Sequence, residues 1–387
     1  MEGRTASTVA WASLVRMCPD PAERALPADP PAVSVILAVR DEERDLTASV
    51  ERILAQDYPG ELEVVLAVGP SADRTLEIAR DLATRDPRVQ VLESPTGITP
   101  ASLNLAVGAA RHDVLVRVDG HSELSDGYVT RAVAELVATG AANVGGRMVP
   151  VGRTPFQRAV ARAMSTPLGI GAAPFHTGGA RGPAPTVYLG VFRRDALERV
   201  GGFDEHFVRA QDWELNHRLR SAGEVVWFDP DLAVTYRPRG DARALARQFF
   251  RTGQWRRQVV RTYPETAGLR YLAPPAVVLA VGGGVLLVVV GATFGPSWPL
   301  LGGLAPLTYA LGVVVGSAVV SRGLGAAAAV RLPAVVATMH LAWGAGFLRG
   351  VTRTTSGAAR AVDYPDAANA PDRVSTTAAP DRPVTED

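Results

Sequence analysis

The chain has no lysine and only one cysteine. Its 387 residues carry 40 basic side chains, all of them arginine, against 39 acidic ones, and the formal net charge is +1. The single Cys18 excludes an internal disulfide and fits a reducing compartment. Nucleic-acid-binding proteins usually carry a strongly basic field, which this balance lacks, so we expect no nucleic-acid partner.

Charge is almost absent between residues 271 and 350, where three apolar runs occupy 275–294, 300–320 and 326–347. Each run has about the ~20 residues that a helix needs to cross a bilayer, so we expect about three transmembrane helices in 271–350. A large buried helical core is the alternative. It is disfavoured because the runs follow one another with almost no amphipathic period.

The stretch before the first apolar run, "RQFFRTGQWRRQVVR", is rich in arginine. It predicts an amphipathic interfacial segment at 241–270 and, by the positive-inside rule, a protein of the inner or plasma membrane with its catalytic domain in the cytoplasm. Arg322 and Arg331, which follow the second run, agree with that orientation. Arg349, Arg353 and Arg360 follow the third run and disagree with three full spans, so a re-entrant or interfacial third run stays open.

The remaining chain divides into two unstructured ends and one domain. Residues 1–30 and 351–387 are rich in small and polar residues and proline, a composition that buries too little apolar area to fold, so we expect disorder there. Residues 31–240 alternate between strand-like and helix-like segments. This alternation predicts an α/β fold with a doubly wound, mainly parallel sheet, followed by the C-terminal helical transmembrane region.

The predicted sheet places three polar stretches around one crevice. Short apolar runs rich in valine lie at 33–39, 62–68, 89–93 and 113–118, and segments with helical spacing lie between them at 46–56, 73–84 and 100–110, the last with Thr99 as its expected N-cap. In a doubly wound sheet the ligand binds beyond the carboxyl ends of the strands. "RDEE", "GPSAD" and "DGH", which follow the first, second and fourth strands, should therefore meet there.

Asp119 and His121 flank Gly120 at the end of the fourth predicted strand. Residues two apart on an extended backbone point to one face, and a glycine between them lets the chain turn closely around a ligand. A carboxylate and an imidazole at this spacing can share one divalent cation. Spacing alone also allows Asp119 to cap the next element and His121 to be a surface residue.

The chain resembles the family 2 glycosyltransferases, which have the GT-A fold, in the order of six stretches: "VSVILAVRDEE", "DRTLEIA", "SPTGITPASLNLAVGAA", "VLVRVDGHSEL", "VGGRM" and "YLGVFRRDALERVGGFDEHFVRAQDWELNHRLRSAGEVVWFDP". Within that family, D-x-H in place of D-x-D looks like the succinoglycan-biosynthesis ExoA type of bacterial membrane transferase. The resemblance covers roughly residues 33–260 and, more loosely, the membrane tail.

The resemblance implies a nucleotide-sugar site. The implied residues are Glu42, Asp73, Gly97, Asn104 and Asp119, with Asp119 and His121 holding Mg²⁺ or Mn²⁺ against the diphosphate. One departure concerns the loop after the second strand, where Val68, Gly69, Pro70 and Ser71 replace the family's usual carboxylate that recognises the base. The identity of the nucleotide therefore stays open.

The resemblance also implies a general base and an acceptor side. Asp212 in "AQDWELNHRL" matches the acid of the family's E-D motif, although Gln211 replaces the preceding Glu, and an N-cap role for Asp212 is the alternative. The acceptor or diphosphate side would be formed by Tyr188, Gly190, Trp213, Arg251 and Trp255. Arg251 could neutralise the diphosphate and Trp255 could stack on a sugar; a membrane-surface helix would account for the same residues.

These features together predict a membrane-bound, inverting, metal-dependent glycosyltransferase. It would move a sugar, such as a hexose, from a nucleotide sugar to a lipid-linked or glycan acceptor in cell-surface polysaccharide or glycolipid synthesis. A nucleotidyltransferase is one rival, but it usually needs a glycine-rich basic loop after the first strand, and "AVRDEER" is not one. A non-catalytic scaffold of a polysaccharide export system is the other, and it would not need Asp119, His121 and Asp212 in this order.

Overall fold

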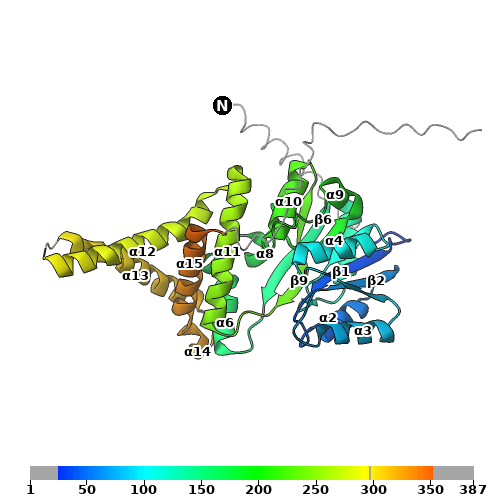
Figure 1. Cartoon of the computed structure of the whole chain (residues 1–387), viewed down its shortest axis with the longest axis horizontal. Coiled ribbons are helices and arrows are strands. Elements are labelled where there is room, and N and C mark those ends of the chain that lie inside the picture. Colours follow the sequence, from blue (N-terminus) through cyan, green and yellow to red (C-terminus); the bar gives the residue numbers. More distant parts are fainter. Residues whose placement is uncertain (1–24, 296–297, 352–387) are drawn as a thin grey trace, which may run out of the picture.

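A computed structural model describes residues 25–295 and 298–351 of the chain. An α/β domain forms one side of the molecule, and a group of long helices projects from the other (Figure 1). Most of the two segments expected to be disordered, 1–30 and 351–387, lies outside the described residues.

One mixed sheet runs through the α/β domain, with strand order β3-β2-β1-β4-β8-β6-β9-β5 and β7 paired to β9. The first four strands of this order are parallel, as predicted, whereas β8 pairs antiparallel with both β4 and β6. The strands are β1 Val33–Val39, β2 Leu62–Val68, β3 Val89–Glu93, β4 Val114–Arg117, β5 Glu123–Leu124, β6 Asn143–Pro150, β7 Gly182–Pro183, β8 Tyr188–Arg193 and β9 Val226–Tyr236.

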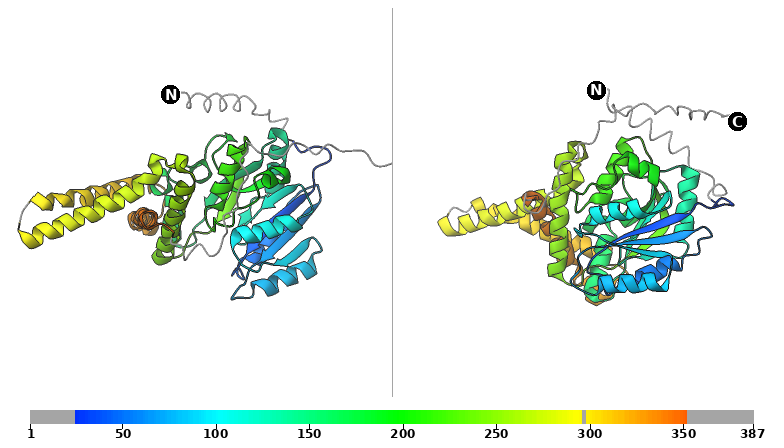
Figure 2. Two further views of the ribbon diagram at one scale, coloured as in Figure 1. Left: turned by 45° about the horizontal axis from the view of Figure 1, so that its top comes forward. Right: turned by 45° about the vertical axis from the view of Figure 1, so that its right-hand side comes forward.

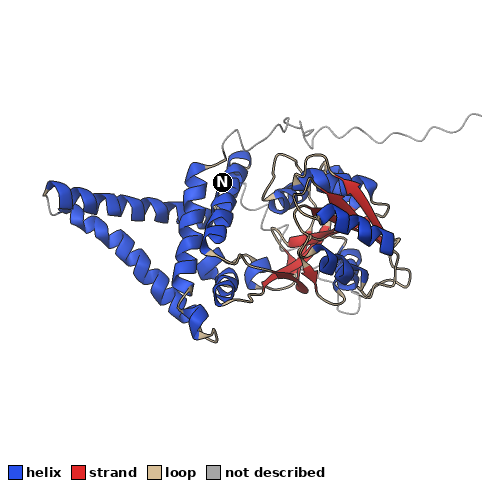
Figure 3. Cartoon of the chain, turned by 60° about the horizontal axis from the view of Figure 1, so that its bottom comes forward, coloured by secondary structure: helices blue, strands red, loops and turns tan. Residues whose placement is uncertain are grey.

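Helices cover both faces of the sheet, which confirms the doubly wound prediction (Figure 3). On one face, Leu46 of α2, Leu82 of α3 and Val133 of α5 are buried in one core cluster. On the other face, Leu103 of α4 and Leu215 of α10 are buried in a second cluster. The helices of this domain are α2 Leu46–Leu54, α3 Thr75–Arg85, α4 Thr99–Ala109, α5 Tyr128–Thr139, α6 Pro155–Met164, α7 Pro167–Ile170, α8 Pro174–Thr177, α9 Arg194–Arg199 and α10 Gln211–Ser221.

Two expected helix caps differ in the structure. Thr99 is the first residue of α4, and Ile98 takes the N-cap position. Arg74 precedes α3 at its N-cap, while the carboxylate of Asp73 accepts the N–H of Thr75 from just outside the helix. Both shifts are small because a helix boundary depends on hydrogen bonds within a single turn.

The C-terminal part consists of helices: α11 Ala242–Thr262, α12 Leu269–Phe294, α13 Leu304–Val320, α14 Ala326–Ala329 and α15 Leu332–Arg349, with short 3₁₀ turns at Pro264–Thr266 and Trp298–Gly303. Three segments are long and apolar enough to cross a membrane: Leu269–Phe294, Leu300–Val320 and Ala326–Arg349. In two further views α12 and α13 form a projecting hairpin, while α15 lies beside α11 (Figure 2).

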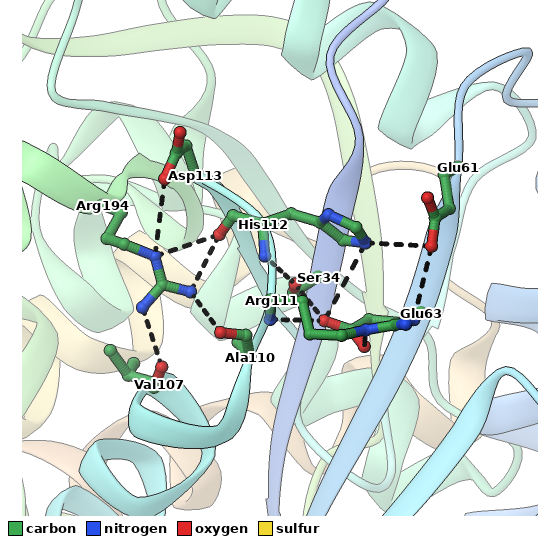
Figure 4. A network of polar contacts seen from close by, with 9 residues as sticks. All are labelled: Ser34, Glu61, Glu63, Val107, Ala110, Arg111, His112, Asp113 and Arg194. Atoms are coloured by element: carbon green, nitrogen blue, oxygen red, sulfur yellow. Dashed lines mark hydrogen bonds and ion pairs between the residues drawn. The ribbon is translucent and has the colours of Figure 1, made fainter. Parts of the chain in front are cut away.

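A polar network closes the amino-terminal edge of the parallel strands (Figure 4). The buried Glu63 accepts hydrogen bonds from Oγ of Ser34 at 2.6 Å and from Nε of Arg111 at 2.7 Å. Nearby, the guanidinium of Arg194 donates to the carbonyl oxygens of Val107, Ala110 and His112. The predicted site residues Glu42, Asp73 and Asp119 lie at the opposite, carboxyl edge of the strands.

Candidate functional site

The loops that follow β1 and β2 are tied together at the carboxyl edge. The backbone N–H of Glu42 donates to Oγ1 of Thr75 at 2.7 Å, and the N–H of Glu43 donates to the carboxylate of Asp73 at 3.1 Å. The hydrogen bond from Thr75 is the main reason why the pKa of Asp73 is lowered. Asp73, predicted to bind the nucleotide sugar, thus also holds Glu43 directly and Glu42 through Thr75.

Glu42 contacts the predicted metal loop directly. Nδ1 of His121 lies 2.8 Å from Oε1 of Glu42, and this hydrogen bond raises the pKa of His121 against the opposing effect of burial. A side chain at Gly120 would meet Cγ1 of Val39 at 2.8 Å and Cγ of Glu42 at 3.2 Å. The glycine of "DGH" is therefore required because the loop after β4 packs closely against the end of β1.

Arg117, the last residue of β4, connects the two carboxylates predicted to carry the chemistry. Its side chain is buried, with 2% of the residue exposed, and Nη2 donates to Oδ1 of Asp119 at 3.0 Å. Nη1 forms an ion pair with Oδ1 of Asp212. Arg117 is absent from the residues predicted by sequence, although an arginine in the apolar run "VLVRV" is a signal, since buried charges are nearly always paired.

The helix that carries Asp212 is anchored by buried amides. One turn beyond Asp212, Oδ1 of Asn216 accepts from Nδ2 of Asn143 at 2.7 Å, and Nδ2 of Asn216 donates to Thr186 at 3.0 Å. A side chain at Gly190 would overlap Oδ1 of Asn143. Gly190, predicted on the acceptor side, thus makes room for this anchor.

Asp212 does not cap its helix. It is the second residue of α10, and the N-cap residue is Ala210, which has the left-handed conformation and makes no side-chain capping bond. The alternative in which Asp212 serves only as an N-cap is therefore not supported. Its carboxylate is instead directed to Arg117.

Aromatic and charged groups connect α10 to the helices that follow. Trp213 stacks on His217, with ring centroids 5.4 Å apart, and the guanidinium of Arg256 lies 4.3 Å from the Trp213 ring and 3.5 Å from the Tyr271 ring. Burial lowers the pKa of Arg256 to about 10. This stack joins the helix of Asp212 to α11 and to the first residues of α12, so the site and the apolar helices are mechanically linked.

A second connection involves Glu214, which is fully buried. Its Oε1 accepts a hydrogen bond from the hydroxyl of Tyr263 at 2.7 Å, and Arg218 donates to both of its oxygens. Burial, followed by the nearby Glu214, raises the pKa of Tyr263. The hydroxyl of Tyr263 thus fixes α10, which carries both Glu214 and Arg218, against the end of α11.

The remaining predicted residues have different environments. Trp255 is 7% exposed and packs with Phe207 and Val259, so its ring lies inside the protein rather than presenting a face to a sugar. Arg251 is exposed. Burial, followed by the positive charge of Arg251, lowers the pKa of Arg209.

Other predicted residues make close contacts at the carboxyl edge of the sheet. The side chain of Asn104 accepts from the N–H of Phe203 at 2.9 Å and donates to its carbonyl oxygen at 2.8 Å, so it holds the chain that leads toward α10. Gly97 has a φ of 59°, and a side chain at Gly69 would lie 2.5 Å from the Cα of Gly97. Burial, followed by the charge of Asp119, raises the pKa of Tyr188, which lies beside the metal loop.

Backbone strain concentrates around these residues. In the described part of the chain, the non-glycine residues with positive φ are Asp41 at 55°, Leu189 at 55° and Ala210 at 63°. Each is within two positions of a predicted site residue. Left-handed backbone is costly for residues with a Cβ and collects at functional sites, so this distribution supports a functional role for the carboxyl edge.

Known proteins resemble this chain over much of its length. The model of the family "Glycosyl transferase family 2" matches residues 34–201, which contain Glu42, Asp119 and His121. The succinoglycan biosynthesis protein ExoA of Rhizobium meliloti (strain 1021) is 34% identical over 319 residues, which cover 81% of this chain and 93% of that protein. This chain therefore belongs to glycosyl transferase family 2.

Further comparisons agree with this assignment. The glycosyltransferase AglE of Haloferax volcanii is 28% identical over 59% of this chain and 74% of its own length. The structure of the mannosyltransferase PcManGT from Pyrobaculum calidifontis, in complex with GDP-Man and Mn²⁺, superimposes with a TM-score of 0.52 at 21% identity, covering 88% of this chain and 93% of that one. The comparisons favour a glycosyltransferase over a nucleotidyltransferase or a scaffold and confirm the predicted fold.

Proposed function

We propose that the protein is a membrane-bound inverting glycosyltransferase that moves a sugar from a nucleotide sugar to a lipid-linked acceptor. The observation that carries the proposal is the pair of ion contacts made by Arg117. They bring Asp119, at the end of β4, and Asp212, at the start of α10, to one buried guanidinium. A residue for the leaving group and a residue for the attacking group are thereby held beside the same guanidinium.

Asp212 is the proposed general base. A sugar hydroxyl is a weak nucleophile, and a carboxylate that accepts its proton as the new C–O bond forms lowers the barrier by about 10²- to 10⁴-fold in rate. The bond between the anomeric carbon and the diphosphate oxygen breaks in the same step, and the nucleoside diphosphate leaves with the electron pair. Attack from the side opposite the leaving group inverts the anomeric carbon.

Asp119 and His121 are the proposed ligands of a divalent cation, Mg²⁺ or Mn²⁺. No cluster of three or more His, Cys, Asp or Glu side chains placed to hold a metal occurs in the described part of the chain. The pair nevertheless fits an open site, because Glu42 occupies Nδ1 of His121 and leaves Nε2 for a ligand, as in many metal-binding histidines. When bound, the cation would offset the negative charge that develops on the diphosphate.

The acceptor is proposed to be lipid-linked because the site is joined to apolar helices. The stack of Trp213, Arg256 and Tyr271 runs from the residue after the proposed base to the start of α12. An enzyme anchored in this way keeps its crevice beside a substrate that cannot leave the bilayer. The arginines of α11 support a cytoplasmic catalytic domain, since positively charged segments near membrane helices favour that side.

The test uses purified protein in detergent or in native membranes and a panel of UDP-, GDP- and dTDP-sugars, with release of nucleoside diphosphate as the signal. Asp212→Asn should lower kcat about 10²- to 10⁴-fold with little change in donor KM. Asp113→Asn is the matched control, since the Asp113 side chain is 97% exposed and lies at the opposite edge of the sheet. An Asp212→Asn enzyme with normal kcat would remove the base assignment.

A separate experiment addresses the cation. Mn²⁺ binding, followed by electron paramagnetic resonance in the presence of the nucleotide sugar, should weaken in Asp119→Asn and in His121→Ala and stay normal in Asp113→Asn. Chelator should abolish transfer, and added Mn²⁺ or Mg²⁺ should restore it. Full activity in chelator would refute the metal assignment without affecting the assignment of Asp212.

A further inference from the structure

The third apolar helix, α15, packs along α6 and α11 in addition to its contacts with α12 and α13. Leu332, Val336 and Met339 of α15 belong to one buried cluster with Val160 of α6 and Phe249 of α11. By contrast, most side chains of α12 and α13 are exposed. Only 11% of the most apolar stretch of each of their two segments is buried inside the protein, against 28% for Ala326–Arg349.

Polar groups of α6, α7 and α11 hold the chain before α15, at its middle and after it. Before the helix, Nη1 of Arg162 in α6 donates to the carbonyl oxygens of Val320 and Arg322 at 2.9 and 3.1 Å. Near its centre, Nε2 of His340 lies 2.7 Å from the carbonyl oxygen of Leu168. After the helix, Nε2 of Gln254 in α11 donates to the carbonyl oxygen of Gly350 at 2.8 Å.

The contact with α11 is too close to open without disruption. A side chain at Gly253 of α11 would overlap the carbonyl oxygen of Trp343, and one at Gly346 of α15 would overlap the carbonyl oxygen of Phe250. The two helices therefore meet through reciprocal glycines. Wherever α15 lies relative to the bilayer, the facing part of α11 lies with it.

Helix α11 carries too much charge to lie in the hydrocarbon core of the bilayer. It carries six arginines, at positions 243, 247, 251, 256, 257 and 261. Each arginine at the centre of a membrane helix costs about 2.5–3.5 kcal/mol even on the mildest scale. Since α15 runs along α11 and its two ends are bound to the same domain, it cannot cross a core about 30 Å thick.

The distribution of charge supports two membrane spans rather than three. Between Arg270, at the start of α12, and Arg322, after α13, there is no charged residue, whereas Arg331 and Arg349 flank α15. If only α12 and α13 cross, all four arginines lie on the side of the catalytic domain and the uncharged turn between the helices lies on the other. The arginine-rich side then satisfies the positive-inside rule throughout.

We propose that α12 and α13 cross the bilayer as one helical hairpin and that α15 lies along the lipid surface on the side of the catalytic domain, with Arg331 and Arg349 at anionic headgroups. The C-terminal segment then emerges on the same side as the active site. A helix with an apolar face and arginines at its ends binds such a surface without spanning it. This topology, in place of three spans, also accounts for Arg353 and Arg360, which follow α15 in the sequence.

The test uses the full chain in cells, with Cys18, the only cysteine, replaced by serine. Single cysteines are introduced as Asp113→Cys in the catalytic domain, Ser297→Cys between α12 and α13, and Ser356→Cys after α15. A membrane-impermeant maleimide is then added to intact and to permeabilised cells. Each variant must retain the activity of the Cys18→Ser protein, which shows that it is folded.

The hairpin topology predicts that Ser297→Cys is labelled in intact cells and that Asp113→Cys and Ser356→Cys are labelled only after permeabilisation. Labelling of Ser356→Cys together with Ser297→Cys in intact cells would overturn the proposal in favour of three spans. Labelling of Ser297→Cys only after permeabilisation would show that the hairpin does not cross. These labelling patterns do not depend on which residue is the catalytic base or on whether a metal is bound.

Discussion

Replacing Arg117 with methionine should separate the chemistry of the site from the stability of the fold. The change keeps an apolar stem but removes the guanidinium shared by Asp119 and Asp212. Removing one partner of a buried ion pair costs about 3–5 kcal/mol. The side chains of both carboxylates are 26% exposed, so water compensates in part. We therefore expect a loss of roughly 2–3 kcal/mol, in the range for hydrogen bonds to charged groups.

In free energy, the effect on activity should be about as large as the effect on stability, because a 100-fold loss in rate corresponds to about 2.7 kcal/mol. Without the guanidinium of Arg117 between them, the two carboxylates repel each other and move apart. A displacement of about 1 Å at a reacting group costs about 10²-fold in rate. We expect kcat of Arg117→Met to fall about 100-fold at saturating donor. Arg117→Lys, which retains a positive charge but loses the forked geometry, should recover part of the rate.

The assay is nucleoside diphosphate release per folded molecule, with thermal unfolding in detergent measured in parallel. Arg194→Met is the matched control, because Arg194 is also a largely buried arginine, donating to Val107, Ala110 and His112 at the opposite edge of the sheet. It should lose stability and keep kcat. If Arg117→Met retains the wild-type kcat once the folded fraction is accounted for, the role of Arg117 in positioning the two carboxylates is refuted.

Three other changes test the edge of the sheet opposite the site and the packing of α10. Burial opposes ionisation of Glu63, but hydrogen bonds from Ser34 and Arg111 outweigh it and lower its pKa. This stabilisation is present above the unfolded pKa of about 4.3 and is lost as pH falls through the lower folded value, so melting curves of Glu63→Gln should depend less on pH below about 4.3. Asn216→Ala leaves the amide of Asn143 buried without its partner and should cost about 1–3 kcal/mol by thermal unfolding, with a lower kcat; unchanged values for both would show that this pair does not anchor α10. Arg256→Leu removes the cation between Trp213 and Tyr271 and should cost about 1–2 kcal/mol; a melting temperature equal to that of the native protein would contradict the stack as a link to α12.

Much of the site could be predicted because its residues follow strand ends. Asp119 and His121 come directly after an apolar run, and the carboxyl ends of parallel strands meet at one edge whatever the loops do. The contact of His121 with Glu42 was not predictable in the same way. It depends on how closely the loop after β4 approaches β1, which the local sequence does not encode.

The burial of Arg117 and of Trp255 could not be predicted from neighbouring residues alone. Arg117 stands in an apolar strand, and its partner Asp212 lies on a helix far along the chain, so their pairing appears only when α10 packs on the sheet. Trp255 lies beside arginines that suggest a surface helix, yet the packing of Phe207 and Val259 encloses it. In both cases, packing between distant segments determines whether the side chain is buried.

By itself the sequence determined the alternation of strands and helices, the acidic and histidine residues at the strand ends, and the existence of three long apolar segments. These are local properties, because side-chain periodicity and hydropathy are set by neighbours along the chain. Only the tertiary structure decided that Arg117 joins Asp119 to Asp212 and that α15 packs against α11 through Gly253 and Gly346. Those outcomes depend on surfaces that meet only after folding.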